Sequence, residues 1–207
     1  MTPKVLGVDL DGCLVNFNEG LRERLALVTG RALIEPGFEP PKWNYPVDSY
    51  GYTEDEYAST WKSIEHDRRF WYELQPLPGA IFALVKLAQL AVLGHEVYFI
   101  TSRPGIFAHQ QSHQWISDFG FKQPTVLIDR GGKGPLAAGL RLTHFVDDRP
   151  ENCFDVWNAT SRIGTKIYMP RRSYNVNEQK AVEIMNDETR RWSLIDGIDD
   201  FIREVTA

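Results

Sequence analysis

Residues 8–17 of the chain, "VDLDGCLVNF", place two acids, Asp9 and Asp11, at the end of an apolar run. The residues just before them, "KVLGV", have the short apolar composition of a buried strand, and Gly12 permits a sharp turn directly after the acids. Strands of this kind are typical of parallel sheets with both faces covered. The stretch therefore predicts a strand over residues 4–10 that ends in a polar site.

Four further runs resemble this strand, and helical patterns separate them. The predicted strands are "EVYFI" (96–100), "PTVLID" (124–129), "THFVDD" (143–148) and "TKIYM" (165–169). Helices are predicted over residues 80–93, 108–119, 133–140, 177–191 and 197–205. Strands that alternate with helices predict an α/β fold with a parallel central sheet and helices on both of its faces.

The segment 17–75 has a different composition, rich in aromatic residues, prolines and acids, with helical patches at 18–29 and 53–65. It is too long to be a simple crossover loop. We therefore predict a core domain made of residues 1–16 and 76–207, with a helical cap subdomain of residues 17–75 inserted after the first strand.

Composition narrows the class of protein. The chain has 207 residues and a formal net charge of −5, which argues against binding of polymeric nucleic acid. Two cysteines make no disulfide framework, so a cytoplasmic location is expected. The N-terminus has no signal-peptide pattern, and the longest apolar stretch, 80–94, is too short to span a membrane. The oligomeric state stays open, with a homodimer among the possibilities.

Polar residues follow several of the predicted strands, and the carboxyl ends of parallel strands meet at one edge of a sheet. These residues are Asp9, Asp11, Thr101, Ser102, Asp129, Asp147 and Asp148. Two like charges about 4 Å apart cost about 4 kcal/mol at an effective dielectric near 20. Such a cluster of carboxylates persists if a cation lies among the acids or if some of them stay protonated, and oxygen ligands of this kind suit Mg²⁺. We find no histidine or cysteine accompanying these acids, so zinc is not expected.

Four segments, in order along the chain, resemble the motifs of one known superfamily. "DLDGCLV" (9–15) resembles the first motif of the haloacid dehalogenase-like (HAD) phosphohydrolases, Asp-x-Asp-Gly-x-(Leu/Thr)-(Val/Leu). "FITS" (99–102), Lys133 and "FVDD" (145–148) resemble the second, third and fourth. Within the superfamily the chain is most similar to the 5′(3′)-deoxyribonucleotidases, with "FWYELQPLPGA" and "VDDRPEN" as further points of likeness. The resemblance implies a Rossmann-like three-layer fold with a small cap.

The resemblance also implies a mechanism. Asp9 would attack phosphorus to form an aspartyl-phosphate, and Asp11 would act as general acid and then as general base. Thr101 would donate a hydrogen bond to the phosphate, helped by backbone N–H groups near Ser102. Lys133 would neutralise the phosphate and keep Asp9 ionised.

The same likeness implies the ligands of Mg²⁺. These are the carboxylate of Asp9, the backbone carbonyl of Asp11 and an acid of the Asp147–Asp148 pair. Asp148 is favoured as the direct ligand, with Asp147 behind it or bridged by water.

Substrate contacts are implied for Phe17 and Trp43, which would stack on a base, and stacking contributes about 1–3 kcal/mol per base. Arg103 follows Thr101 and Ser102 where the animal nucleotidases carry no such arginine, and it would bind either the phosphate or a neighbouring acid.

Some of these features also have purely structural interpretations. Phe17 and Trp43 could equally be packing residues of the cap. His109 and His113, four residues apart, are interpreted as surface residues of a helix because their spacing lacks the glutamate of the zinc motif HExxH. Cys13 is interpreted as a small packing residue. The segment "MPRRSYN" (169–175) is interpreted as a solvated loop, with the alternative that its arginines add positive charge near the mouth of the site.

The function predicted from the sequence is a Mg²⁺-dependent phosphomonoesterase that hydrolyses (deoxy)nucleoside monophosphates. Two alternatives remain: a phosphatase for another small phosphomonoester, such as a sugar phosphate or a 3′-phosphate end, and a non-catalytic binding domain on the same scaffold. The preferred base and sugar, and the choice between 5′ and 3′ esters, stay open.

Overall fold

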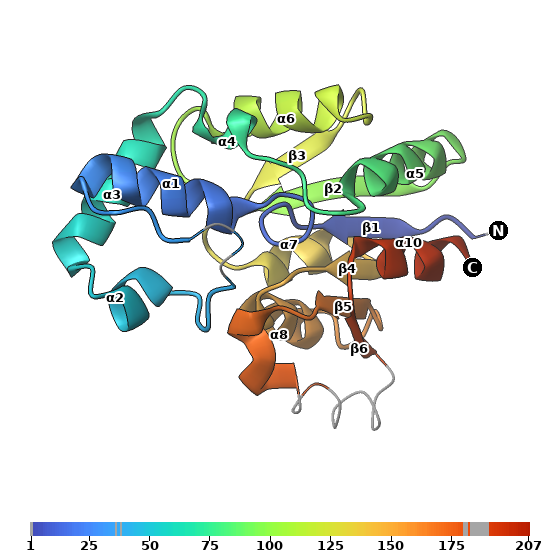
Figure 1. The fold of residues 1–207 in the computed structure, drawn as a ribbon. Coiled ribbons are helices and arrows are strands. Elements are labelled where there is room, and N and C mark those ends of the chain that lie inside the picture. The colour runs from blue at the N-terminus through green and yellow to red at the C-terminus, as the bar shows by residue number, and fades with distance from the viewer. Residues whose placement is uncertain (1, 36, 38, 180–181, 183–190) are drawn as a thin grey trace.

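The chain folds into a parallel six-stranded sheet flanked by helices, as the computed structural model shows (Figure 1). The structure describes residues 2–35, 37, 39–179, 182 and 191–207. The strands are β1 (Val5–Val8), β2 (Glu96–Thr101), β3 (Thr125–Ile128), β4 (His144–Val146), β5 (Lys166–Pro170) and β6 (Trp192–Ile195). They lie in the order β3-β2-β1-β4-β5-β6, and every neighbouring pair is parallel. The predicted α/β fold is therefore confirmed.

The sequence predicted five strands, and the structure adds a sixth, β6, at the edge of the sheet. β6 has four residues, and its two central positions, Ser193 and Leu194, are only half-buried. Ser193 interrupts its apolar residues, so the stretch "WSLI" lacks the continuous apolar composition that predicts a buried strand. The helix predicted over 177–191 falls largely outside the described residues.

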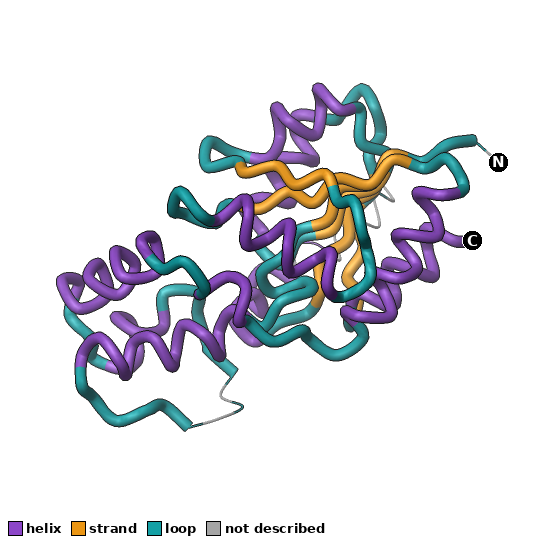
Figure 2. Tube along the Cα trace, turned by 90° about the horizontal axis from the view of Figure 1, so that it is seen from above, coloured by secondary structure: helices purple, strands orange, loops and turns teal. Residues whose placement is uncertain are grey.

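Helices cover both faces of the sheet, as Figure 2 shows. On one face lie α5 (Ala80–Val92), α6 (Ala108–Asp118) and α10 (Ile198–Thr206), and on the other α7 (Lys133–Leu140) and α8 (Pro150–Ala159). Alternate residues of β2 join the two cores: Val97 and Phe99 pack into the first, and Tyr98 and Ile100 into the second. This division follows from the twofold alternation of side chains along a strand.

Residues 17–75 form a helical segment beyond the carboxyl ends of the strands (Figures 1 and 2). It contains α1 (Phe17–Thr29), α2 (Tyr45–Tyr50), α3 (Glu54–His66) and α4 (Phe70–Glu73), and α1 packs against α3. The Thr53 hydroxyl and the Glu56 carboxylate cap the start of α3 reciprocally.

The two ends of this segment lie side by side. The backbone N–H of Asn16 donates to the carbonyl of Gln75 at 2.8 Å, and that of Leu77 donates to the carbonyl of Leu14 at 2.8 Å. An inserted subdomain needs this closure, because the chain must leave and rejoin the core at one place. The division into core and cap stays a prediction that this arrangement supports.

The order of the strands brings the predicted site residues together. β1 lies between β2 and β4, and the backbone N–H of Asp9 donates to the carbonyl of Val146 at 3.0 Å. On the other side of β1, Thr101 ends β2. The residues after β1, β2 and β4 therefore share one edge of the sheet, as parallel strands require.

No helix among the described residues is long and apolar enough to span a bilayer.

Candidate active site

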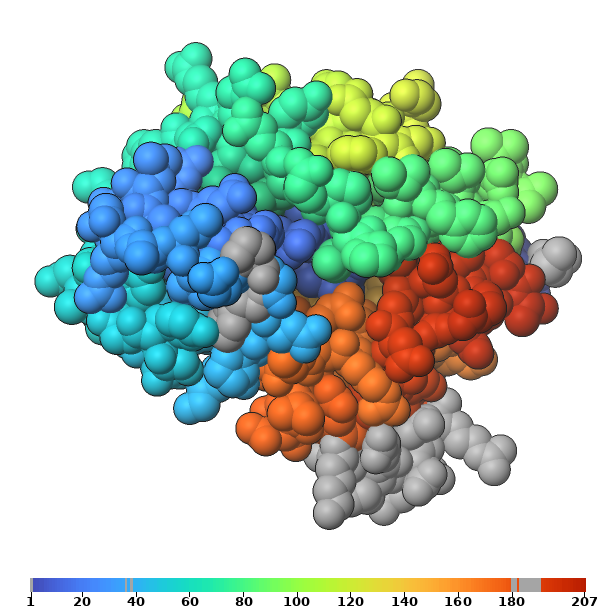
Figure 3. Space-filling model, in the orientation of Figure 1, coloured from blue at the N-terminus to red at the C-terminus, as the bar shows by residue number. Residues whose placement is uncertain are grey.

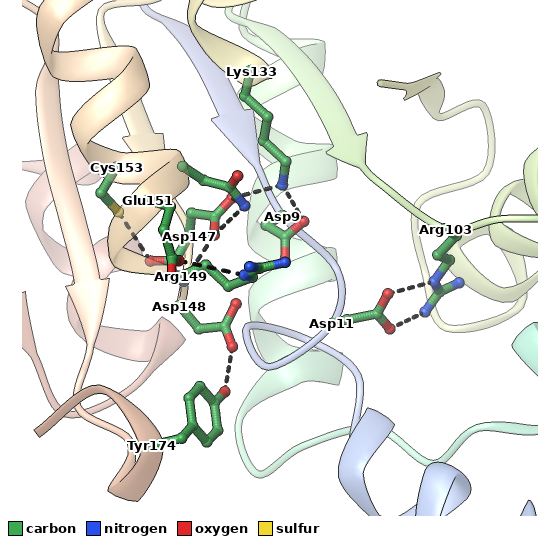
Figure 4. A network of polar contacts seen from close by, with 11 residues as sticks. Asp9, Asp11, Arg103, Lys133, Asp147, Asp148, Arg149, Glu151, Cys153 and Tyr174 are labelled. Carbon is green, nitrogen blue, oxygen red and sulfur yellow. Dashed lines mark hydrogen bonds and ion pairs between the residues drawn. The ribbon is translucent and has the colours of Figure 1, made fainter. Parts of the chain in front are cut away.

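Three buried acids and one lysine lie together at the ends of β1 and β4 (Figure 4). Asp9, Asp147 and Asp148 are 5%, 0% and 1% exposed. Lys133, the first residue of α7, donates through Nζ to Oδ1 of Asp9 and, at 2.6 Å, to Oδ2 of Asp147. The lysine therefore joins the acids of two neighbouring strands.

Burial and mutual repulsion oppose the ionisation of these acids. Burial raises the pKa of the Asp9 carboxyl well above its usual range, although the Lys133 ammonium opposes the rise. Burial, and then the charge of Asp147, raises the pKa of Asp148 to about 7. The Lys133 pKa is also raised, because two carboxylates stabilise its charged form more than burial disfavours it. Three acids facing one ammonium leave an excess of negative charge that a cation would neutralise.

The carboxylate of Asp148 has an atom free for such a cation. Its Oδ2 accepts a hydrogen bond from the Tyr174 hydroxyl, whereas its buried Oδ1 has no hydrogen-bond partner among the described residues. Ligand atoms of Asp9, Asp148 and Cys13 lie within 4.8 Å of one another, and this is the one group in the described part of the chain that could hold a metal ion. The carboxylates therefore fit Mg²⁺, which prefers oxygen ligands.

Asp147, by contrast, is saturated. Its Oδ1 accepts from the backbone N–H of Arg149 at 2.9 Å and from Nδ2 of Asn152 at 3.0 Å, and its Oδ2 accepts from Lys133. These bonds fix its orientation. They support the prediction that Asp148 binds the ion directly and that Asp147 lies behind it or is bridged to it by water.

The expectation that no cysteine accompanies the acids is wrong. Cys13 follows the Gly12 turn, and its sulfur lies in the same group as Asp9 and Asp148. Burial raises the pKa of the Cys13 thiol well above its ordinary value, so the group is neutral. A neutral thiol is a poor ligand for a hard ion, and the site keeps the chemical character of a carboxylate site.

Gly12 allows this close approach. Its φ is +80°, and a Cβ built on it would lie 2.1 Å from Oδ2 of Asp148 and 2.7 Å from the Tyr174 hydroxyl. Both the backbone conformation and the lack of space require glycine here. The turn within the first motif therefore lies directly against Asp148 of the fourth motif.

A cavity of about 130 Å³ opens beside these groups, and we call it the strand-end cavity. Thr101, only 1% exposed, lines it, and its hydroxyl has no hydrogen-bond partner among the described residues. Buried hydroxyls normally have a partner, so this group is available to a ligand. The neighbouring Ser102 is exposed and also lines the cavity.

Aromatic rings form another part of the cavity wall. Phe17 stacks on Trp61, Trp71 and Trp43, with ring centroids 5.6, 5.7 and 6.0 Å away. All four rings line the cavity. The sequence pointed to Phe17 and Trp43 but not to Trp61 and Trp71, because nothing in a segment so rich in aromatic residues distinguishes those two.

Asp11 lies apart from the other acids and faces Arg103 (Figure 4). Nε of Arg103 donates to one carboxylate oxygen at 2.9 Å, and Nη2 donates to the other at 2.8 Å. Of the two partners considered for Arg103, a phosphate and a neighbouring acid, the structure places it on the acid. A contact between Arg103 and substrate stays untested.

Asp129, which also ends a strand, does not line the cavity. Its Oδ1 accepts a hydrogen bond from the backbone N–H of Gly131, in the loop that leads to α7. His109 is exposed and His113 half-buried on α6, and neither belongs to the group of possible metal ligands found among the described residues.

The segment that follows β5 is not the solvated loop that the sequence indicated. The Arg172 guanidinium donates to the carbonyl of Gly12 through Nη2 at 2.7 Å, and Tyr174 bonds Asp148. Ser173 donates to the carbonyl of Pro40 at 2.7 Å, and Figure 3 shows these two parts of the surface in contact. The sequence around Arg172 and Tyr174 did not indicate that their partners would be Gly12 and Asp148, because these residues are far away along the chain.

Comparison with known proteins identifies the fold of this chain. No family model matches the sequence. Among solved structures, the L-2-haloacid dehalogenase of Xanthobacter autotrophicus aligns with a TM-score of 0.52 at 13% identity, over 100% of this chain and 99% of that one. A haloacid dehalogenase-like hydrolase of Streptococcus pneumoniae aligns with a TM-score of 0.50 at 15% identity, over 83% and 86%. The fold is therefore the HAD-like hydrolase fold, as the motifs indicated.

Sequence relatives carry narrower names. The protein named "Putative nucleotidase OB0422" of Oceanobacillus iheyensis is 29% identical over 113 residues, which is 53% of this chain and 56% of the relative. The 5′-nucleotidase of Pseudomonas aeruginosa is 28% identical over 58% of this chain and 57% of its own. The human mitochondrial 5′(3′)-deoxyribonucleotidase is 28% identical over 70% and 61%. The chain thus spans less than two thirds of the length of each of these relatives.

Proposed function

We propose that the protein is a Mg²⁺-dependent phosphomonoesterase that hydrolyses nucleoside or deoxynucleoside monophosphates through an aspartyl-phosphate. One observation carries the proposal: the Thr101 hydroxyl, which has no hydrogen-bond partner in the described part of the chain, and the Asp9–Lys133 pair line one cavity. A hydroxyl donor, an ammonium and a carboxylate nucleophile are the groups that phosphoryl transfer to a side chain requires. The nucleotidase names of the sequence relatives support the same class of substrate.

The first half-reaction transfers the phosphoryl group to Asp9. A carboxylate oxygen of Asp9 attacks phosphorus, the bond from phosphorus to the ester oxygen breaks, and Asp11 gives that oxygen a proton. Thr101 donates a hydrogen bond to a phosphoryl oxygen, and Lys133 offsets the negative charge.

In the second half-reaction, Asp11 takes a proton from a water molecule that attacks the aspartyl-phosphate. The bond between phosphorus and the Asp9 oxygen then breaks, and inorganic phosphate leaves. The protein is restored with Asp9 as a carboxylate and Asp11 carrying the proton it lost.

Mg²⁺ would be held by the carboxylates of Asp9 and Asp148, and when bound it supplies positive charge against the phosphate oxygens. Asp147, held by Lys133 and Asn152, keeps the neighbouring groups in position. Tyr174 orients Asp148 through its hydroxyl and leaves the other carboxylate oxygen open.

The aromatic wall favours a substrate with a planar base. The strand-end cavity, at about 130 Å³, is smaller than the roughly 300–1,000 Å³ of typical ligand pockets. A second hollow of about 450 Å³ shares Phe17 and Trp43 with it. A phosphate in the first and a nucleoside that extends past these two rings would use both spaces.

Other predictions remain part of the proposal. Residues 17–75 would act as the substrate-selecting cap over a core of residues 1–16 and 76–207. A small phosphomonoester is the expected partner, whereas a cytoplasmic location and a homodimer are predictions on which the site has no bearing.

Phosphate release from a panel of monoesters tests the proposal. We expect the purified protein to hydrolyse dTMP or dUMP in Mg²⁺, to lose this activity in EDTA, and to lose it in Asp9→Asn. Asp129→Asn is the matched control, because it makes the same chemical change at a neighbouring strand end outside the cavity. An Asp9→Asn protein with full activity would contradict the covalent mechanism.

The panel also separates the alternatives. Equal rates of hydrolysis of nucleotides and of sugar phosphates would favour a general phosphatase over a nucleotidase. Faster hydrolysis of a 3′-phosphate end than of any nucleotide would identify the protein as a 3′-phosphatase. If no ester releases phosphate, the remaining alternative is a non-catalytic binding domain.

A further inference from the structure

Arg103 is enclosed on three sides at the edge of the strand-end cavity. Its side chain is 0% exposed, and its two nitrogens Nε and Nη2 hold the two oxygens of Asp11. The third, Nη1, donates to the hydroxyl of Ser112 in α6 at 2.9 Å. The guanidinium also lies 4.8 Å from the centre of the Trp71 ring. Arg103 is therefore fixed independently of Asp11.

This arrangement restricts the orientation of Asp11. A paired set of parallel N–H···O bonds fixes the plane of a carboxylate as well as its position. A carboxylate has roughly four acceptor positions, and the Arg103 fork occupies two of them. The Asp11 side chain is 16% exposed and lines the cavity, so its remaining positions stay available for a proton in transit.

The support of Arg103 extends to the 17–75 segment. Nε1 of Trp71 donates to the carbonyl of Pro104 at 3.1 Å, and the backbone N–H of Tyr72 donates to Gln111 in α6 at 3.2 Å. Trp71 also stacks on Phe17 in the aromatic wall. The residue that holds Asp11 is thus braced by the same helix, α4, that shapes the substrate side of the cavity.

We propose that Arg103 is a positioning residue that aligns Asp11 for proton transfer to the leaving group, and that it does not bind the phosphate. This inference rests on the proposed function, because it assigns Arg103 a part in the phosphomonoester reaction. Three of its nitrogens bond protein atoms and its side chain is fully buried, so it contacts the reaction through Asp11.

Leaving groups that differ in their need for a proton provide the test. An alkoxide leaves only when it is protonated, whereas p-nitrophenolate leaves without a proton. The value of kcat/KM reports the steps up to aspartyl-phosphate formation, in which Asp11 acts as the acid. We would measure kcat/KM for p-nitrophenyl phosphate and for the alkyl phosphate that the wild-type protein hydrolyses fastest in the panel.

In Arg103→Met we expect kcat/KM to fall about 100-fold on the alkyl ester and less than about threefold on the aryl ester, because general acid catalysis contributes roughly 10²–10⁴-fold. Arg103→Lys keeps the charge but not the fork, so about a tenfold loss on the alkyl ester should remain. If Arg103→Met does not fold, Arg103→Lys and Ser112→Ala carry the test, with the same selective loss.

The chain offers a matched control in Arg24. This arginine pairs with Asp67, donates to the Ser63 hydroxyl at 3.0 Å and lies 5.0 Å from the Phe70 ring, outside the strand-end cavity. Arg24→Met should change kcat/KM equally on both esters, if at all.

Each other outcome has a distinct meaning. Equal losses on both esters in Arg103→Met, or no loss on either, would overturn the role of Arg103 while leaving the phosphatase intact. A wild-type protein that releases no phosphate from any ester would overturn the proposed function itself.

Discussion

At the scale of single residues, the site is defined by polar groups whose bonding is incomplete. The buried Thr101 hydroxyl and Oδ1 of Asp148 have no hydrogen-bond partner among the described residues. An unsatisfied buried polar group costs about 1–3 kcal/mol of stability, so a fold retains it only where something else is gained. We infer that the gain is ligand binding, because both atoms belong to side chains that line the strand-end cavity.

Thr101→Val separates these two effects. The change removes the unpartnered hydroxyl and keeps the side-chain shape. We therefore expect the free energy of unfolding to stay the same or rise by up to about 1 kcal/mol. Inhibition by inorganic phosphate should weaken about 10- to 100-fold, which corresponds to one hydrogen bond to a charged group at roughly 1.5–3 kcal/mol.

Thr160→Val is the control for Thr101→Val. Thr160 is equally buried, but its hydroxyl donates to the carbonyl of Val156 at 2.6 Å. This variant should lose stability and keep its phosphate affinity. Unchanged phosphate inhibition in Thr101→Val would remove Thr101 from the binding site.

At the scale of elements, the segment after β5 holds the loops that carry the acids in place through hydrogen bonds. Asn175 is 0% exposed, and its Nδ2 donates to the carbonyl of Asp148 at 2.8 Å and to that of Pro170 at 2.9 Å. Together with Tyr174 and Arg172 it ties the end of β5 to the first and fourth motifs. Arg172 and the short 3₁₀ helix η1 (Ser173–Asn175) that follows it therefore fix two sheet-edge loops in one geometry.

Asn175→Ala should destabilise the protein by about 2–3 kcal/mol, because it leaves buried carbonyl groups without partners. Urea unfolding measures the change. Asn158→Ala, at an exposed position on α8, should stay within about 0.5 kcal/mol of the wild type. Equal unfolding midpoints for Asn175→Ala and the wild type would show that the segment does not brace the site.

At the scale of the whole molecule, the strand order brings distant carboxylates into one buried group. β1 and β4 are neighbours in the sheet, so Asp9 and Asp148 meet although they are far apart in the sequence. Their repulsion and burial oppose folding with both acids ionised, and a bound cation would relieve this cost. If the proposed site binds Mg²⁺, its binding and the stability of the fold are therefore coupled.

Mg²⁺ should consequently raise the thermal unfolding midpoint. At 100 times its dissociation constant, a ligand of the native state stabilises by about 2.7 kcal/mol, or roughly 5–10 °C for a chain of this length. Asp148→Asn should lose most of this shift, and Asp129→Asn should keep it. A shift of the same size in Asp148→Asn would place the ion elsewhere.

Much of the fold, and the gathering of several candidate site residues, could be predicted because both depend on local patterns. A buried strand followed by acids and a glycine has few structural solutions, so the ends of the predicted strands were found within a few residues. For the same reason Asp9, Thr101 and Lys133 lie together as the parallel sheet required. The sequence did not indicate α4, which is a single helical turn, or β6, whose apolar residues are interrupted by Ser193.

By itself, the sequence determined the parallel α/β fold and the acids at its strand ends, because strand periodicity and turn chemistry act over a few residues. Only the tertiary structure decided which long side chains hold those acids. Arg103 on Asp11 and Tyr174 on Asp148 are contacts made across the chain by flexible side chains. Their partners depend on how whole elements pack, and the sequence near each residue does not predict that packing.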